Sequence, residues 1–112
     1  MPYSVKRFTD ELMLDPADAR EIFDAFFEDA LPLLQEGKKA MQEGDRQLLS
    51  RKMHTLKGSA LNLRMDGLGN LAARAEKGSS LSASELAGIL EAVQIELEEV
   101  EASVRTFYKE GQ

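Results

Sequence analysis

The chain has 112 residues and a formal net charge of −6, which results from 20 acidic and 14 basic side chains. It contains no cysteine and a single histidine, His54, which excludes disulfide frameworks and thiolate metal sites and leaves too few imidazoles for a histidine metal cage. The acidic balance argues against a nucleic-acid partner, because neutralising the phosphate backbone requires a basic face.

The N-terminal part of the chain predicts two helices, a short one over residues 4–13 and a long one from about 16 to 43. Asp15 supplies an N-cap acceptor immediately before Pro16, and proline is favoured at the first helical position. Apolar residues follow at helical spacing at Ile22, Phe23, Phe26, Phe27, Ala30, Leu33, Leu34 and Met41. The spacing indicates that one face of the long helix enters the core.

The middle of the chain predicts two more helices. Gly44 ends the long helix and Asp45 caps the next one, which we place at about 46–64. Its apolar residues step by four and three, at Leu49, Met53, Leu56, Ala60 and Leu63, and define an inward seam. A shorter helix is predicted at about 67–77, and Gly78 ends it.

The C-terminal part predicts the last helix. Ser82 and Glu85 form a capping-box pattern at its start. Apolar residues then alternate by four and three at Leu86, Leu90, Val93, Leu97, Val100, Val104 and Phe107. This alternation predicts a helix that extends almost to residue 112.

Five helices joined by short turns, with no strand candidate, predict an all-α fold. We expect an antiparallel up-down-up-down four-helix bundle with a short N-terminal capping helix. With 43% hydrophobic residues a chain of this length can bury its own core, so we expect residues 1–112 to form a single domain. No export signal or span of roughly 20 apolar residues is present. We therefore expect a cytoplasmic monomer without membrane association.

His54 distinguishes this bundle from an ordinary one. With the seam directed inward, His54 lies roughly 140° from it on the helical wheel and Gly58 roughly 180° from it, so both are expected on the outer face. Lys57, Gly58 and Leu61 follow the histidine at helical spacing, and Gln47 and Ser50 lie one turn earlier. A surface histidine beside a surface lysine would be the ordinary interpretation. Gly58, however, costs about 1 kcal/mol relative to alanine inside a helix, which suggests that an external group needs the space.

Charge is unevenly distributed along the chain. Residues 46–64 carry five bases and no acid, whereas residues 85–101 carry six glutamates and no base. The bases are Arg46, Arg51, Lys52, Lys57 and Arg64. Basic side chains around one imidazole favour a phosphoryl group or an acidic partner.

The segment Met53-His54-Thr55-Leu56-Lys57-Gly58-Ser59-Ala60-Leu61-Asn62-Leu63 closely resembles the H-x-x-K-G-S motif of histidine phosphotransfer (HPt) domains. The resemblance implies that His54 Nε2 accepts a phosphoryl group from the aspartate of a receiver domain and passes it to another. It also implies that Lys57 lies near the phosphoryl group and that Gly58 allows the receiver to approach. Arg64 departs from the family pattern, because many members have glycine shortly after Asn-Leu.

Glu76 is a candidate for orienting the imidazole. The turn between the third and fourth helices centres near Met65, eleven residues after His54 and eleven before Glu76. An antiparallel hairpin would therefore bring Glu76 level with His54. A carboxylate that accepts from Nδ1 would leave Nε2 free as the nucleophile. The alternative is an ordinary solvated helix carboxylate.

The expected partners are response-regulator receiver domains and a hybrid sensor histidine kinase. The residues expected to contact them are Gln47, Ser50, Arg51, Gly58 and Leu61. No cofactor is expected in this chain, since no carboxylate cluster flanks His54 and Mg²⁺ would come from the receiver. The chain has no nucleotide-binding motif, so we expect a phosphocarrier without kinase or phosphatase activity of its own. Two alternatives are a non-phosphorylated adaptor that binds a receiver or kinase domain through the same face, and a structural bundle with an incidental histidine.

Overall fold

The computed structural model describes residues 2–110, which form five α-helices and one short 3₁₀ turn and contain no β-strand. The helices are α1 (Val5–Leu12), α2 (Pro16–Gln42), α3 (Arg46–Asn62), α4 (Asp66–Glu76) and α5 (Ala83–Lys109). The 3₁₀ turn η1 (Gly78–Ser80) joins α4 to α5. The prediction of an all-helical bundle is confirmed.

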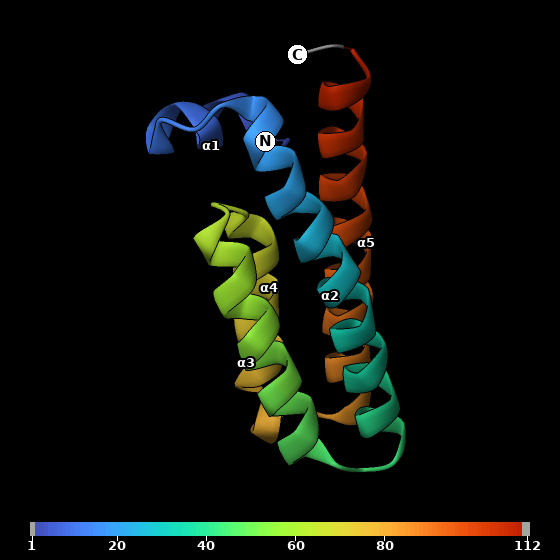
Figure 1. Cartoon of the computed structure of the whole chain (residues 1–112). Coiled ribbons are helices and arrows are strands. Elements are labelled where there is room, and N and C mark those ends of the chain that lie inside the picture. Colours follow the sequence, from blue (N-terminus) through green and yellow to red (C-terminus); the bar gives the residue numbers. More distant parts are fainter. Residues whose placement is uncertain (1, 111–112) are drawn as a thin grey trace.

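Four helices lie alongside one another, and the fifth lies across one end of them. In the ring of contacts α2 packs against α3, α3 against α4, α4 against α5, and α5 against α2. Figure 1 shows the α2–α3 and α4–α5 turns at one end, whereas the α3–α4 turn and α1 lie toward the other. The molecule measures 44 × 20 × 20 Å, so α2 and α5 run along most of its length.

The helix starts follow the capping residues named above. The Asp15 carboxylate accepts from the backbone N–H of Ala17 at 2.8 Å, and Asp45 accepts from Leu48 at 3.0 Å. Ser82 and Glu85 form the reciprocal capping box at the start of α5, with both bonds at 3.1 Å. These side chains satisfy backbone donors that the first turn of a helix leaves unpaired.

The core lies where the apolar seams of the helices meet. All five seam residues of α3 are buried, namely Leu49, Met53, Leu56, Ala60 and Leu63. The a/d residues of α5 are buried from Leu86 to Val104, and Phe107 at the end of that helix is half-buried. Gly37 of α2 allows close packing against α3, because a β-carbon there would lie 3.1 Å from Met53 Cε and 3.2 Å from Leu49 Cδ1.

Arg64 occupies the turn between α3 and α4 in a left-handed backbone conformation, with φ of 61°. The N–H of the following residue, Met65, donates to the carbonyl of Ala60 at 2.9 Å, and this closes the end of α3. Glycine adopts this conformation most easily. Arginine takes the same backbone geometry, at a cost of roughly 1 kcal/mol.

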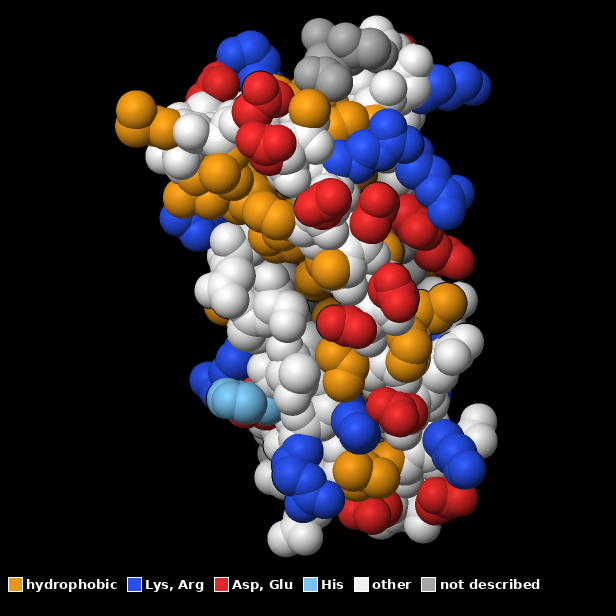
Figure 2. All heavy atoms as spheres, in the orientation of Figure 1, with side chains coloured by type: hydrophobic (Ala, Val, Ile, Leu, Met, Phe, Trp, Pro, Cys, Tyr) orange, Lys and Arg blue, Asp and Glu red, His pale blue; other side chains and the backbone are white. Residues whose placement is uncertain are grey.

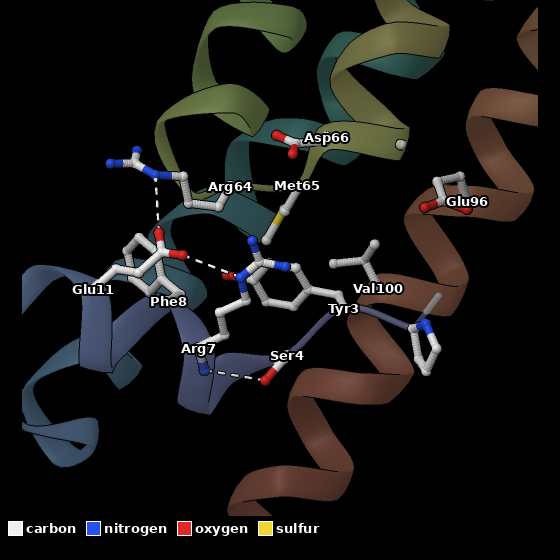
Figure 3. A pocket seen from close by; sticks show the side chains of 12 residues that line it. Tyr3, Ser4, Arg7, Phe8, Glu11, Arg64, Met65, Asp66, Glu96 and Val100 are labelled. Carbon is white, nitrogen blue, oxygen red and sulfur yellow. Dashed lines mark hydrogen bonds and ion pairs between the residues drawn. The ribbon is translucent and has the colours of Figure 1, made fainter.

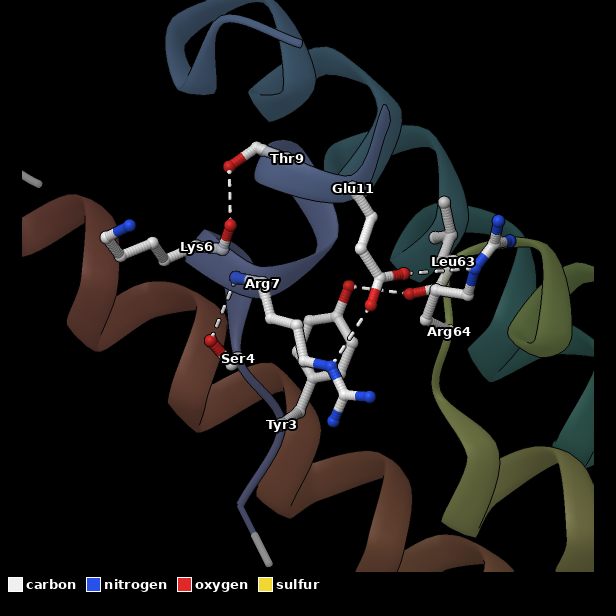
Figure 4. A network of polar contacts seen from close by, with 8 residues as sticks. All are labelled: Tyr3, Ser4, Lys6, Arg7, Thr9, Glu11, Leu63 and Arg64. Atoms are coloured by element: carbon white, nitrogen blue, oxygen red, sulfur yellow. Dashed lines mark hydrogen bonds and ion pairs between the residues drawn. The ribbon is translucent and has the colours of Figure 1, made fainter. Parts of the chain in front are cut away.

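α1 lies at the end of the bundle that carries the α3–α4 turn. The Tyr3 hydroxyl donates to the carbonyl of Leu63 at 2.7 Å. The Glu11 carboxylate lies 3.1 Å from Arg7 Nε and 3.6 Å from Arg64 Nε, so it joins α1 to the turn (Figure 4). A cavity of about 470 Å³ lies beside this network, between α1, the turn and α5 (Figure 3). Burial raises the pKa of Tyr3, which therefore acts as a neutral hydrogen-bond donor.

The structure also bears on membrane association. None of the helices in the described part of the chain is both long enough and apolar enough to span a lipid bilayer.

Candidate functional site

His54 lies in the middle of α3 with its side chain 67% exposed. Figure 2 shows the imidazole projecting at the flank of the molecule. Its Nδ1 lies 2.8 Å from Glu76 Oε2. No hydrogen bond from the described residues reaches Nε2.

Glu76 is the last residue of α4, and its carboxylate joins two side chains of α3. Oε2 contacts His54 Nδ1, and Oε1 lies 2.7 Å from Lys57 Nζ. The hydrogen bond from Lys57, and secondarily the one from His54, hold the pKa of Glu76 below its usual value despite partial burial. An ionised carboxylate can only accept hydrogen bonds, so its contact with Nδ1 requires a hydrogen on that nitrogen. The contact therefore favours the tautomer in which Nδ1 carries the hydrogen and Nε2 is free.

Lys57 is 24% exposed and lies on the α4 side of α3. Its ammonium is bound to Glu76 instead of extending freely from the surface. The three side chains therefore form one cluster in which a single carboxylate contacts both the imidazole and the ammonium.

Gly58 lies beside His54 on the exposed surface of α3. A β-carbon built at Gly58 would meet nothing within 4 Å, so internal packing does not require glycine there. Gln47 and Arg51 are also exposed. These three positions are exposed, as expected for residues that contact a partner.

Two residues expected on the same open face contact α4, and one of them is not exposed. Ser50 is half-buried, and its hydroxyl donates to the backbone carbonyl of Glu76 at 2.9 Å, so the expectation of an exposed serine is wrong. Leu61 is 39% exposed but leans onto α4, where a β-carbon on Gly69 would lie 2.5 Å from Leu61 Cδ2. Both side chains lie on the flank of α3 that faces α4, and a wheel drawn for one helix cannot show that neighbour.

The basic side chains of α3 and its C-terminal turn are largely paired within the molecule. Arg46 donates to the carbonyl of Leu81 at 2.5 Å, and Lys52 lies 3.3 Å from Glu36. Lys57 and Arg64 have the carboxylate partners described above. Arg51 alone among the five has neither an ion pair nor a side-chain hydrogen bond within the described residues. The expected basic stripe is therefore mostly neutralised locally, and its charge does not define the site.

A groove between α2 and α3 was not identified from the sequence. It has a volume of about 270 Å³ and is lined by apolar residues that include Ile22, Phe26 and Leu33. The available signal was the apolar face of α2, which is wider than its buried seam, since Ile22 remains 40% exposed. Figure 2 shows apolar side chains gathered on the face that also presents the histidine.

Small side chains lie between the imidazole and this groove. Going around α3 from His54, Gly58 lies at about 40°, Thr55 at about 100° and Ser59 at about 140°. Ser59 also lines the groove. Arg51, at about 60°, is the long side chain in this sector and lies one turn earlier. A partner that covers the imidazole can therefore extend to α2 over the small side chains that follow His54.

Comparison with known proteins agrees with this geometry. A family model described as the Hpt domain matches residues 21–103, a range that contains His54, Lys57, Gly58 and Glu76 and excludes α1. No match was found among curated proteins or among solved structures. Because the matched range covers well over half of the chain, this protein belongs to the Hpt domain family, the histidine phosphotransfer domains of phosphorelay signalling.

Proposed function

We propose that this protein carries a phosphoryl group on His54 Nε2 between receiver domains. The observation that supports this most directly is an exposed imidazole whose Nδ1 is 2.8 Å from an ionised carboxylate. Nε2 forms a bond to phosphorus while the bond from phosphorus to the donor aspartate breaks, and the aspartate leaves as a carboxylate. Onward transfer reverses these steps toward the aspartate of another receiver.

The chemical demands on this chain are modest. Phosphoryl transfer proceeds through a loose transition state, so catalysis depends on positioning and on neutralising charge. Glu76 orients the imidazole and stabilises the positive charge that develops on the ring as Nε2 attacks. Lys57 supplies positive charge next to the phosphoryl group, and the receiver supplies Mg²⁺. The protein is a carrier without kinase or phosphatase activity of its own.

The receiver is proposed to dock over the outer face of α3. In-line transfer requires the phosphoaspartate to come close to Nε2, and Gly58 presents no side chain that would obstruct it. Gln47 and Arg51 border the imidazole, and the apolar groove beside α2 offers further contact area. A hybrid sensor kinase would deliver phosphate through its own receiver domain to the same face.

The architecture in this proposal is one domain over residues 1–112. α2 to α5 form an antiparallel up-down-up-down four-helix bundle, and α1 caps the end remote from the α2–α3 turn. We propose that it acts as a cytoplasmic monomer, since a single exposed histidine per chain suffices for the relay.

The test is incubation with a panel of phosphorylated receiver domains. Wild-type protein should gain phosphate that is labile in acid and stable in base, and His54→Gln should gain none. The free energy of unfolding of this variant should stay within about 0.5 kcal/mol of wild type, because the side chain is mostly exposed.

Two results would contradict the proposal. Phosphate retained by His54→Gln would place the acceptor elsewhere. Receiver binding that is equally tight for both proteins, with phosphate on neither, would instead support the non-phosphorylated adaptor.

A further inference from the structure

Ser50 contacts the main chain of the residue that orients the imidazole. It lies one turn before His54 on α3, and its hydroxyl donates to the carbonyl of Glu76 at 2.9 Å. The side chain of Glu76 is bound by His54 and Lys57 of the same helix. Positions 50, 54 and 57 thus form one stripe of α3 that holds both the backbone and the carboxylate of a single α4 residue.

The end of α4 needs such a contact. Glu76 is the last residue of the helix, and the last carbonyls of a helix have no intrahelical donor. The chain then changes to the 3₁₀ turn η1, which Arg46 holds through the carbonyls of Gly78 at 3.3 Å and Leu81 at 2.5 Å. Helix ends are where local unfolding is least costly, so an unanchored Glu76 would lose its fixed position first.

We propose that Ser50 is a positioning residue for phosphotransfer, which acts through the main-chain carbonyl of Glu76 to keep the carboxylate against His54 Nδ1. This inference rests on the proposed function. Without the hydroxyl, the last turn of α4 frays and the carboxylate contacts Nδ1 for a smaller fraction of time. The proton then redistributes between the two ring nitrogens, and Nε2 is less often the free nucleophile. Small losses of alignment are costly in group transfer.

The test compares Ser50→Ala with Ser103→Ala. Ser103 is a half-buried serine of α5 whose hydroxyl makes no hydrogen bond within the described residues, so it controls for loss of a hydroxyl from a helix. In single-turnover transfer from a phosphorylated receiver, Ser50→Ala should be about three- to tenfold slower. Its affinity for the receiver should be unchanged. Ser103→Ala should match wild type in both measurements.

Imidazole ¹⁵N chemical shifts provide a readout that does not depend on phosphotransfer. At alkaline pH, wild type should show mainly hydrogen on Nδ1, and Ser50→Ala should show a larger share on Nε2. Ser50→Thr keeps the hydroxyl and should restore both the shifts and the rate. Ser50→Thr also serves as the test variant if Ser50→Ala does not fold. A Ser50→Thr protein that folds but has altered imidazole ¹⁵N shifts would overturn the proposal.

A double-mutant cycle with Glu76→Ala separates the possible roles. If Ser50 acts through Glu76, adding Ser50→Ala to Glu76→Ala should produce no further slowing. If the two substitutions slow transfer independently, so that their effects multiply, the proposal is overturned. Weaker receiver binding by Ser50→Ala with unchanged ¹⁵N shifts would also overturn it, because Ser50 would then be a docking contact. If wild type accepts no phosphate while the shifts still respond to Ser50→Ala, the proposed function fails and the positioning of the imidazole stands.

Discussion

Gly58 and Gly37 both lie inside long helices, but a side chain added at each would meet opposite surroundings. At Gly58, on the outer face of α3, a β-carbon would have nothing within 4 Å. At Gly37, on the buried face of α2, it would lie 3.1 Å from Met53 Cε and 3.2 Å from Leu49 Cδ1. Helix propensity disfavours glycine by about the same amount at both positions, so the reason for each must lie in its neighbours.

The comparison separates two kinds of region in one small bundle. Around Gly37 the molecule is closely packed, because side chains of α3 already fill the space beside α2. Around Gly58 it is open, and the free space lies beside an exposed imidazole and leads toward the α2–α3 groove. We infer that the packed regions carry the stability, whereas the outer face of α3 is shaped for a partner.

The strongest test of this comparison is a side chain on the open face. Gly58→Gln should slow phosphotransfer from a receiver by about 100-fold, because the added side chain obstructs in-line approach to His54. It should raise the free energy of unfolding by up to about 1 kcal/mol. Single-turnover transfer and urea denaturation measure the two effects.

Gly88→Gln is the matched control for that test. Gly88 is also exposed within a helix and would give a β-carbon nothing within 4 Å, but it lies on α5. The Gly88→Gln variant should show a similar rise in the free energy of unfolding and should transfer phosphate at the wild-type rate. A Gly58→Gln variant that transfers at the wild-type rate would show that the partner docks elsewhere.

The same substitution on the packed side should affect stability instead. Gly37→Gln is expected to lower the free energy of unfolding by about 2 kcal/mol, because it forces a polar side chain against Leu49 and Met53. Urea denaturation measures the loss. Transfer per folded molecule should stay near the wild-type value. Unchanged stability would mean that α2 and α3 separate easily, and the contrast between the two glycines would disappear.

Substitutions of Lys57 test whether its ammonium acts on the phosphoryl group or only holds Glu76. Lys57→Ala should slow transfer about tenfold, less than the hundredfold or more expected for a preorganised oxyanion donor, because Glu76 already shares the ammonium. Lys57→Arg should recover part of the rate, since it restores the charge. An unchanged rate in Lys57→Ala would remove Lys57 from the reacting face and assign it to holding Glu76.

Tyr3 tests whether the capped end of the bundle is purely structural. Tyr3→Phe removes the hydrogen bond to Leu63, and Tyr108→Phe removes an equivalent bond of 2.7 Å to the carbonyl of Pro16. Each should cost about 1 kcal/mol of unfolding free energy in thermal or urea denaturation. Neither should alter phosphotransfer. Slower transfer in Tyr3→Phe alone would couple α1 to the histidine site.

The smallest expected effect is the pH dependence of the Glu76 contacts. Lys57 and His54 lower the pKa of Glu76 in the folded protein, so its ionised form contributes stability that is fully present above the usual value near 4.5. That contribution is lost as the pH falls through the lowered pKa. The melting-temperature difference between wild type and Glu76→Gln should therefore narrow as the pH falls below that usual value. A difference that widens below that value would contradict the ion pair.

The sequence by itself determined the helices, their caps and the inward faces, because these depend on local interactions. Asp15, Asp45 and the Ser82–Glu85 pair begin helices where the pattern predicted, since an N-cap bonds only to its own first turn. The seam of α3 is buried as predicted. Counting residues across the α3–α4 turn also placed Glu76 beside His54, because an antiparallel hairpin pairs positions symmetrically about its centre.

The tertiary structure alone decided which outer-face residues remain open. A helical wheel places Ser50 and Leu61 near His54, but α4 lies along that flank, so Ser50 is half-buried and bonds to Glu76, whereas Leu61 stays exposed and leans onto Gly69. The partners of Arg46, Lys52 and Arg64 are equally invisible in the sequence, because Leu81, Glu36 and Glu11 belong to distant segments. The groove between α2 and α3 exists only when two helices meet. Periodicity reports the direction of each side chain from its own axis, whereas exposure and pairing depend on what the neighbouring helices bring to it.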